Sequence, residues 1–329
     1  MIVRYFKSGF PVQYITIGMI GLLIWGMAAY DPPAMPFPTG PIPFYSILFN
    51  WLSGIPYLAL AIGFLLVLFE AILLNYIFSK HDLIRHNTSL AALLFLLFIS
   101  FLPQFLTLTP VNITVLFLLF FLNVLLKAFS QIEPVELIFT AGFFISLASF
   151  FYFQAILLYG FLLICFLVYR TMQWREWISS FVGFITPYLF LFVVYFLTDQ
   201  LKVLIEMYSD FFTQLSFSFP VLSSYNRAMI VLAGLFTILG FWDTVIHMRE
   251  KTVEVRKKTI ILVWLFFWIL ITLMFSGIFQ LYHIGLFAIC LASFVTNFYL
   301  NLRKPFLFQL LLWLFIIVIF ANTTLFFFQ

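Results

Sequence analysis

Long runs of apolar residues, separated by short polar segments, dominate the pattern along this chain. The runs are roughly twenty residues long, the length that an α-helix needs to cross a hydrocarbon core of about 30 Å. Lipid offers the backbone no hydrogen bonds, so each run is expected to be a helix. The pattern predicts about eleven spanning helices, over residues 12–30, 55–79, 88–103, 110–127, 136–151, 153–169, 178–197, 227–246, 260–277, 281–300 and 306–326.

Composition agrees with this pattern. The chain has 329 residues, of which 65% are hydrophobic and only 9% charged, too few to cover a soluble domain. The predicted fold class is an all-α, polytopic integral membrane protein with a single transmembrane domain over residues 1–329. That domain would divide into a seven-helix module over 1–197, an outer amphipathic segment over 198–226 and four further helices over 227–329.

The placement of basic residues predicts the orientation. With the N-terminus in the cytoplasm, only Lys202 and Arg227 among the lysines and arginines fall on the outer side. Positive residues concentrate in cytoplasmic loops, so the N-terminus is expected inside and the C-terminus in the periplasm of a bacterial inner membrane. The net charge of +4 is thereby explained without nucleic acid. The predicted partners are membrane lipids and possible membrane proteins, with no nucleic acid.

Two outer segments are longer than a tight turn. The segment 31–54 begins with DPPAMPFPTGPIP, which is stiff and extended, and continues into an aromatic stretch that suits a helix in the interface. The segment 198–226 carries apolar residues at helical spacing opposite Asp199, Lys202, Glu206 and Asp210, which predicts an amphipathic helix on the outer surface.

Polar residues that could form a functional site lie at the predicted outer ends of the spans. Asp31 follows the first span, and the outer ends of the eighth and tenth carry Tyr225, Asn226, Arg227, Gln280 and His283. Arg227 is either a headgroup anchor or a ligand for a lipid phosphate, which its forked donors suit. Asp31 is either a turn cap or a catalytic residue, and His283 either structural or functional.

Two acids lie within other spans. Glu70 sits near the middle of the second span, where an ionisable group is costly. It is either a neutral group that holds two helices together or part of a proton or ion pathway. Asp243, near the cytoplasmic end of its span, is expected to pair with a nearby arginine or histidine.

No cofactor or metal is predicted. Cys165 and Cys290 lie in apolar spans, and the four histidines divide between the two sides of the membrane. Phosphate-binding loops and zinc-protease motifs are absent from the sequence. A single aspartate at the outer face is nevertheless compatible with a bound divalent ion.

Residues 138–199, with Gly142, a break at Tyr152, the sequence WREW and Pro187, resemble an uncharacterised family of Bacteroidota inner-membrane proteins. Members of that family are sometimes labelled carotene monooxygenases. The residues here contradict that label, because a carotenoid-cleaving oxygenase needs four histidines on a β-propeller.

The plan of the chain is also similar to that of the C-type glycosyltransferases, which use polyprenyl-phosphate-linked sugars. Asp31 matches the catalytic aspartate after the first span, 43–53 the loop helix, and 198–226 the second outer segment. The second acid common in that family is missing near Asp31.

Three functions remain open from the sequence. In a glycosyltransferase, Asp31 would act as general base, Arg227 would hold the phosphate, and His283 and Tyr225 would line the sugar site. The alternatives are a non-catalytic subunit of an envelope complex, and a transporter or lipid flippase.

Overall fold

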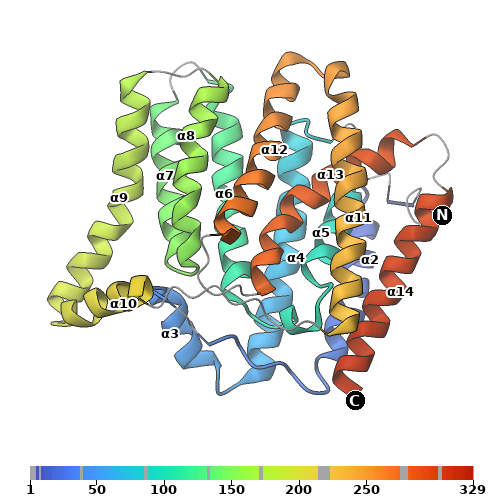
Figure 1. Ribbon diagram of the computed structural model, residues 1–329, viewed down its shortest axis with the longest axis horizontal. Helices are drawn as coiled ribbons and strands as arrows, with labels where there is room; N and C mark the ends of the chain where they lie inside the picture. The colour runs from blue at the N-terminus through green and yellow to red at the C-terminus, as the bar shows by residue number, and fades with distance from the viewer. Residues whose placement is uncertain are drawn as a thin grey trace.

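The computed structural model describes residues 5–6, 9–37, 40–84, 88–131, 134–169, 173–213, 223–274, 281–302 and 306–328. Helices make up the fold, and the described residues contain no strand (Figure 1). The α-helices are α2 (Pro11–Met27), α3 (Pro43–Leu52), α4 (Pro56–Lys80), α5 (Leu90–Ile99), α6 (Pro110–Ala128), α7 (Val135–Ser149), α8 (Leu158–Tyr169), α9 (Trp174–Leu197), α10 (Leu201–Thr213), α11 (Ser224–Ile246), α12 (Val253–Met274), α13 (Phe287–Asn301) and α14 (Phe306–Phe328). Short 3₁₀ turns, η1 (Pro103–Phe105), η2 (Phe153–Leu157), η3 (His247–Glu250) and η4 (Leu281–Leu286), connect some of them.

Six of the described helices are long and apolar enough to cross a membrane, which supports a multi-pass membrane protein. They cover Pro56–Lys80, Pro110–Ala128, Trp174–Leu197, Ser224–Glu250, Tyr282–Asn301 and Gln309–Phe327. The apolar helices α2, α5, α7 and η2 with α8 are shorter, at 10–17 residues. The count of eleven spans and the orientation therefore stay predictions.

The short helix α5 lies at the centre of the bundle. Its sequence LAALLFLLFI is apolar on every side, and all ten residues are buried. At 1.5 Å per residue it is only about 15 Å long, half of a hydrocarbon core. Side chains of α2 hold both of its ends, because Ser89 Oγ donates to Gln13 Oε1 (2.7 Å) and Trp25 Nε1 donates to Ser100 Oγ (3.0 Å).

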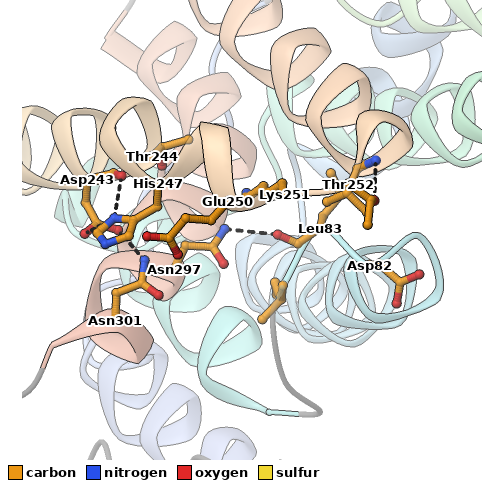
Figure 2. A pocket seen from close by; sticks show the side chains of 12 residues that line it. Asp82, Leu83, Asp243, Thr244, His247, Glu250, Lys251, Thr252, Asn297 and Asn301 are labelled. Atoms are coloured by element: carbon orange, nitrogen blue, oxygen red, sulfur yellow. Dashed lines mark hydrogen bonds and ion pairs between the residues drawn. The ribbon is translucent and has the colours of Figure 1, made fainter.

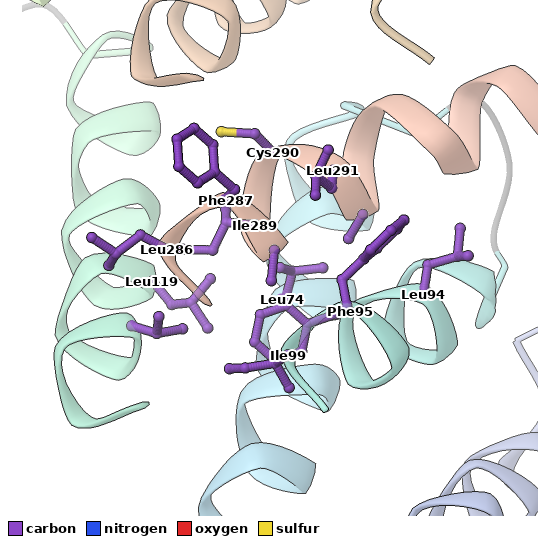
Figure 3. Packing of buried hydrophobic residues seen from close by; sticks show 14 of the residues in the cluster. Leu74, Leu94, Phe95, Ile99, Leu119, Leu286, Phe287, Ile289, Cys290 and Leu291 are labelled. Carbon is purple, nitrogen blue, oxygen red and sulfur yellow. The ribbon is translucent and has the colours of Figure 1, made fainter. Parts of the chain in front are cut away.

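Helix α13 is the second central element, and its residues Phe287–Tyr299 are all buried. At one end Asn297 Nδ2 donates to Leu83 O at 3.0 Å, which ties α13 to the turn after α4 (Figure 2). Further along, its side chains pack with those of α4, α5 and α6 in one apolar cluster (Figure 3). Since lipid tails are as apolar as leucine, close packing rather than escape from water stabilises these contacts.

Helices α7 and α9 approach each other closely through two glycines. A Cβ at Gly183 would collide with Phe139 O, and a Cβ at Gly142 would collide with Ser180 O. Both obstacles are backbone atoms, which cannot rotate away. The two glycines therefore set the spacing of this helix pair, as small residues commonly do in membranes.

The substitution Gly183→Ala is expected to lower stability by about 2 kcal/mol, because the helices must move apart. The matched control is Gly234→Ala on α11, where a Cβ would meet nothing within 4 Å. The control is expected to be neutral or slightly stabilising, since alanine favours helix over glycine. Thermal unfolding of the purified variants in detergent measures both. Equal melting temperatures for the two variants would contradict this packing.

The segments predicted for the outer surface form a layer across one end of the bundle. Helices α3 and α10 lie there at an angle to the long helices, at the lower edge of Figure 1. Tyr208 of α10 packs against Phe153 with ring centroids 5.7 Å apart, and Phe44 N of α3 donates to Phe150 O at 3.3 Å. The helix predicted within 198–226 is thus observed as α10, while residues 214–222 lie outside the described part of the chain.

Glu70 is fully buried on α4. Neither of its carboxyl oxygens has a hydrogen-bond partner among the described residues. The two predicted roles of Glu70, a neutral group that holds two helices together or part of a proton or ion pathway, both stay predictions. Because a charge at this depth would be costly, the side chain is a candidate for proton-linked behaviour.

Cysteine labelling tests the predicted orientation directly. The two native cysteines are fully buried, so an introduced cysteine supplies the signal. Ser53→Cys, exposed between α3 and α4, is expected to react with a membrane-impermeant maleimide in intact spheroplasts. Thr252→Cys, exposed between η3 and α12, is expected to react only after permeabilisation. The reverse pattern would place the N-terminus outside.

Candidate functional site

Helix α14 brings two candidate residues to the same end of the bundle. Asn322 Nδ2 donates to Asn226 Oδ1 (3.3 Å) in the first turn of α11, and Thr323 Oγ1 donates to Met27 Sδ (3.2 Å) at the end of α2. Because these partners adjoin each other on α14, the end of α2 and the start of α11 lie at one level. Asp31 and Arg227, which follow Met27 and Asn226 closely in sequence, therefore share that end (Figure 1).

Asp31 lies in the proline-rich loop after α2, and its side chain is exposed. It makes no hydrogen bond or ion pair within the described residues, so its carboxylate is available to a ligand. The loop is held further along, where the fully buried Tyr45 donates its hydroxyl to Pro36 O at 2.9 Å. Burial raises the pKa of the Tyr45 hydroxyl, and the nearby Tyr282 adds to this rise. Tyr45 therefore keeps its proton for that bond.

The side chains of Arg227 and Tyr225, on the first turn of α11, are exposed. Ser223 caps the helix, with its hydroxyl accepting from Asn226 N at 3.2 Å. Arg227 Nη2 donates to Ser224 Oγ at 3.2 Å, which leaves most of its guanidinium donors unused. Tyr225 is 54% exposed. Asn226, by contrast, is buried and bonded to Asn322, so its position is that of a helix–helix tie.

His283 occupies a different environment from Arg227. Its side chain is fully buried, with Nδ1 bonded to the hydroxyl of Tyr152 and Nε2 lying 3.3 Å from Thr272 Oγ1 and 3.4 Å from Ile269 O. These contacts join η4 to the break before η2 and to α12. Both ring nitrogens are engaged, so the arrangement suits a structural role better than a ligand contact. Gln280 lies outside the described residues.

An apolar groove lies beside the outer layer, between α3, α7 and α9. It encloses about 270 Å³ and is lined by Phe44, Ile47, Phe143, Leu147, Phe150, Pro187, Phe190, Leu191, Val194 and Tyr195. The side chains are almost entirely hydrocarbon, so the groove is suited to an alkyl or prenyl chain and not to a polar ligand.

The opposite end of the bundle holds a polar cavity that the sequence did not reveal (Figure 2). Only one of its contacts was expected: Asp243 pairs with His247, with Oδ1 3.1 Å from Nδ1, which confirms the predicted interface pair. Spacing of four residues on one helix face is the signal for that pair. No local pattern indicates that Asn301, 58 residues away, also donates to Asp243 Oδ2 at 2.8 Å.

Metal-binding chemistry is not apparent at either end. Among the described residues, no three histidine, cysteine, aspartate or glutamate side chains gather closely enough to hold a metal ion. The candidate residues that remain exposed at the outer end are Asp31, Tyr225 and Arg227, which offer one anion, one phenol and one cation.

Comparison with protein families gives the class of this chain. Residues 42–328 match the model of a family of unknown function (DUF6427), so the chain belongs to that family. Searches of curated proteins and of solved structures found no match. The family match agrees with the resemblance to an uncharacterised family and assigns no activity.

The burial of His283 predicts a large effect on stability. His283→Ala is expected to cost about 3 kcal/mol, because it leaves a cavity and an unpaired hydroxyl group on Tyr152, whereas the Thr272 hydroxyl keeps its bond to Ile269 O. The matched variant Tyr225→Ala, at an exposed position, is expected to change stability by less than about 0.5 kcal/mol. Chemical unfolding in detergent measures both. A stable His283→Ala variant would return His283 to the list of ligand residues.

Proposed function

We propose that this chain is a glycosyltransferase of the inner membrane that uses a polyprenyl-phosphate-linked sugar at its periplasmic end. The observation that supports this proposal is that Asp31 and Arg227 share one end of the bundle, because the neighbouring residues Met27 and Asn226 both contact the last turns of α14. Both side chains are exposed, and they carry the opposite charges that sugar transfer from a lipid phosphate requires.

Each residue has a role that follows from its chemistry. The carboxylate of Asp31 accepts the proton of the acceptor hydroxyl as that oxygen attacks the anomeric carbon of the donor sugar. The bond from the sugar to the phosphate oxygen breaks, and the polyprenyl phosphate leaves with the electron pair. The guanidinium of Arg227 stabilises the charge that develops on that phosphate through paired hydrogen bonds. Tyr225 lies beside it as a surface for the sugar.

An apolar surface lies at the same end of the bundle, on the side away from α2, α11 and α14 (Figure 1). The apolar groove between α3, α7 and α9 accepts hydrocarbon and adjoins the layer formed by α3 and α10. A prenyl chain in this groove would leave its phosphate at the membrane boundary, where the outer loops lie.

Binding of polyprenyl phosphate in nanodiscs tests the role of Arg227. Arg227→Gln is expected to weaken binding about tenfold, since loss of a charged hydrogen bond costs about 1.5 kcal/mol. The matched control is Lys202→Gln, a cation predicted on the same side whose ammonium is fully solvated beside Glu206. The control is expected to bind as the wild type does. Equal binding by Arg227→Gln and the wild type would remove Arg227 from the site.

Sugar transfer tests the role of Asp31. Asp31→Asn is expected to reduce transfer from a polyprenyl-phosphate sugar by at least about a hundredfold, the usual contribution of a general base, with little change in lipid binding. Asp199→Asn, the exposed acid between α9 and α10, is the control and is expected to retain full activity. The glycosyltransferase proposal fails if Asp31→Asn transfers sugar at the wild-type rate.

The second candidate is a non-catalytic subunit of an envelope complex. The burial of His283 and Asn226 favours it, because both were expected to contact the ligand and both are bonded within the protein. This candidate predicts membrane proteins that co-purify with the chain and no transfer activity in the wild type. A transporter or flippase rests on Glu70 alone.

A further inference from the structure

The polar cavity at the end opposite to Asp31 is built from five separate segments. The turn after α4, the end of α11, η3, the start of α12 and the end of α13 surround about 230 Å³ (Figure 2). Its lining is Asp82, Leu83, Ile84, Asp243, Thr244, His247, Glu250, Lys251, Thr252, Val255, Asn297 and Asn301. The cavity lies where these helices end, so it is at the predicted cytoplasmic boundary of the membrane.

Hydrogen bonds within the protein fix the inner wall of the cavity. Asp243 receives Asn301 Nδ2 at 2.8 Å and lies 3.1 Å from His247 Nδ1, and Asn297 Nδ2 reaches Leu83 O at 3.0 Å. These bonds connect α13 to both α11 and the turn after α4. The polar groups are thus held in place before any ligand arrives, which lowers the entropy cost of binding.

The lining of the cavity is rich in hydrogen-bond acceptors. Asn297 is 94% buried, since its exposed fraction is 6%, and its carboxamide oxygen accepts no hydrogen bond from the described residues. Asp243 has a carboxylate that is only 12% exposed and retains acceptor capacity beyond its two bonds. Asp82 and Glu250 add two further carboxylates to the lining, and the side chain of Glu250 is exposed.

One cation stands beside these acceptors. Lys251 also lines the cavity, and its ammonium donates to Thr259 Oγ1 at 3.1 Å. An arrangement of three carboxylates, those of Asp82, Asp243 and Glu250, and a carboxamide oxygen next to a lysine is complementary to a ligand with an amine and a nearby anion. A bare metal ion fits less well, because the lysine repels it and no three-ligand cluster is present among the described residues.

We propose that this cavity binds a primary ammonium group, with Asp243, Glu250 and the oxygen of Asn297 as its acceptors and Lys251 next to an attached phosphate. Two sources present this chemistry at a membrane boundary: the headgroup of phosphatidylethanolamine and a free amine such as O-phosphoethanolamine. An ammonium group with three N–H donors matches three acceptors, whereas the trimethylated nitrogen of choline has the same charge and no donor. This site is separate from the proposed outer site and does not depend on sugar transfer.

Thermal stability of the full-length protein distinguishes the two sources. In nanodiscs, phosphatidylethanolamine is expected to raise the melting temperature relative to phosphatidylcholine if the ligand is a lipid. In lipid-free detergent, O-phosphoethanolamine is expected to raise it relative to phosphocholine if the ligand is soluble. Stabilisation by the primary amine in either comparison supports the proposal. Equal melting temperatures in both comparisons would overturn it.

Variants assign the effect to this cavity. Asp243→Asn is expected to abolish the preference for the primary amine, or to weaken titrated binding of O-phosphoethanolamine at least about tenfold. Glu250→Gln, at an exposed position where folding is not at risk, is expected to weaken it in the same direction. Glu206→Gln on α10 is the control and is expected to leave the preference unchanged. A preference that survives in both cavity variants would also overturn the proposal.

Discussion

Backbone groups within a bilayer have no water to bond with, and this constraint shapes the whole bundle. Three stretches of the chain leave the α-helical form at positions where neighbours cover them: the turn around η1, the break before η2, and η4. In each, buried side chains complete the surroundings, as Phe105, Tyr152 and His283 do. The short helix α5 has the same requirement, because it cannot cross a hydrocarbon core alone. Longer helices therefore surround these segments, and their own outer faces meet the lipid.

The same constraint explains why the core contains polar pairs. Each pair connects a short or broken segment to a neighbour: Trp25 to Ser100 at the end of α5, and Tyr152 to His283 at the break before η2. A polar group without a partner would be costly at these depths. Several buried polar atoms nevertheless have no hydrogen-bond partner among the described residues, including Thr107 Oγ1, Ser146 Oγ and both carboxyl oxygens of Glu70. The fold tolerates the free-energy cost of burying the carboxyl group of Glu70. This buried carboxyl group is the strongest argument for the transporter alternative.

Sequence alone could predict the long helices because their apolar length is a physical requirement of the bilayer. It could not separate helices that face lipid from those that face protein, since both are apolar. The run over 88–103 was therefore predicted as a span, whereas α5 covers only Leu90–Ile99 and is wholly enclosed. The side of the membrane assigned to Asp31 and Arg227 followed from counting spans. The burial of His283 could not be predicted from the sequence, because its partner Tyr152 lies 131 residues away along the chain.

The remaining question at the outer end is how one exposed carboxylate could become a catalyst. An exposed group is hydrated, and salt screens its effect on other charges. As the proposed general base, Asp31 would therefore gain catalytic strength only when a substrate excludes water and fixes the acceptor hydroxyl against it. The same condition applies to Arg227, because its guanidinium donors act strongly on a phosphate only after the guanidinium and the phosphate are both desolvated. In the proposed glycosyltransferase a bound substrate would complete this site, whereas a scaffold without such a ligand would leave both side chains in water.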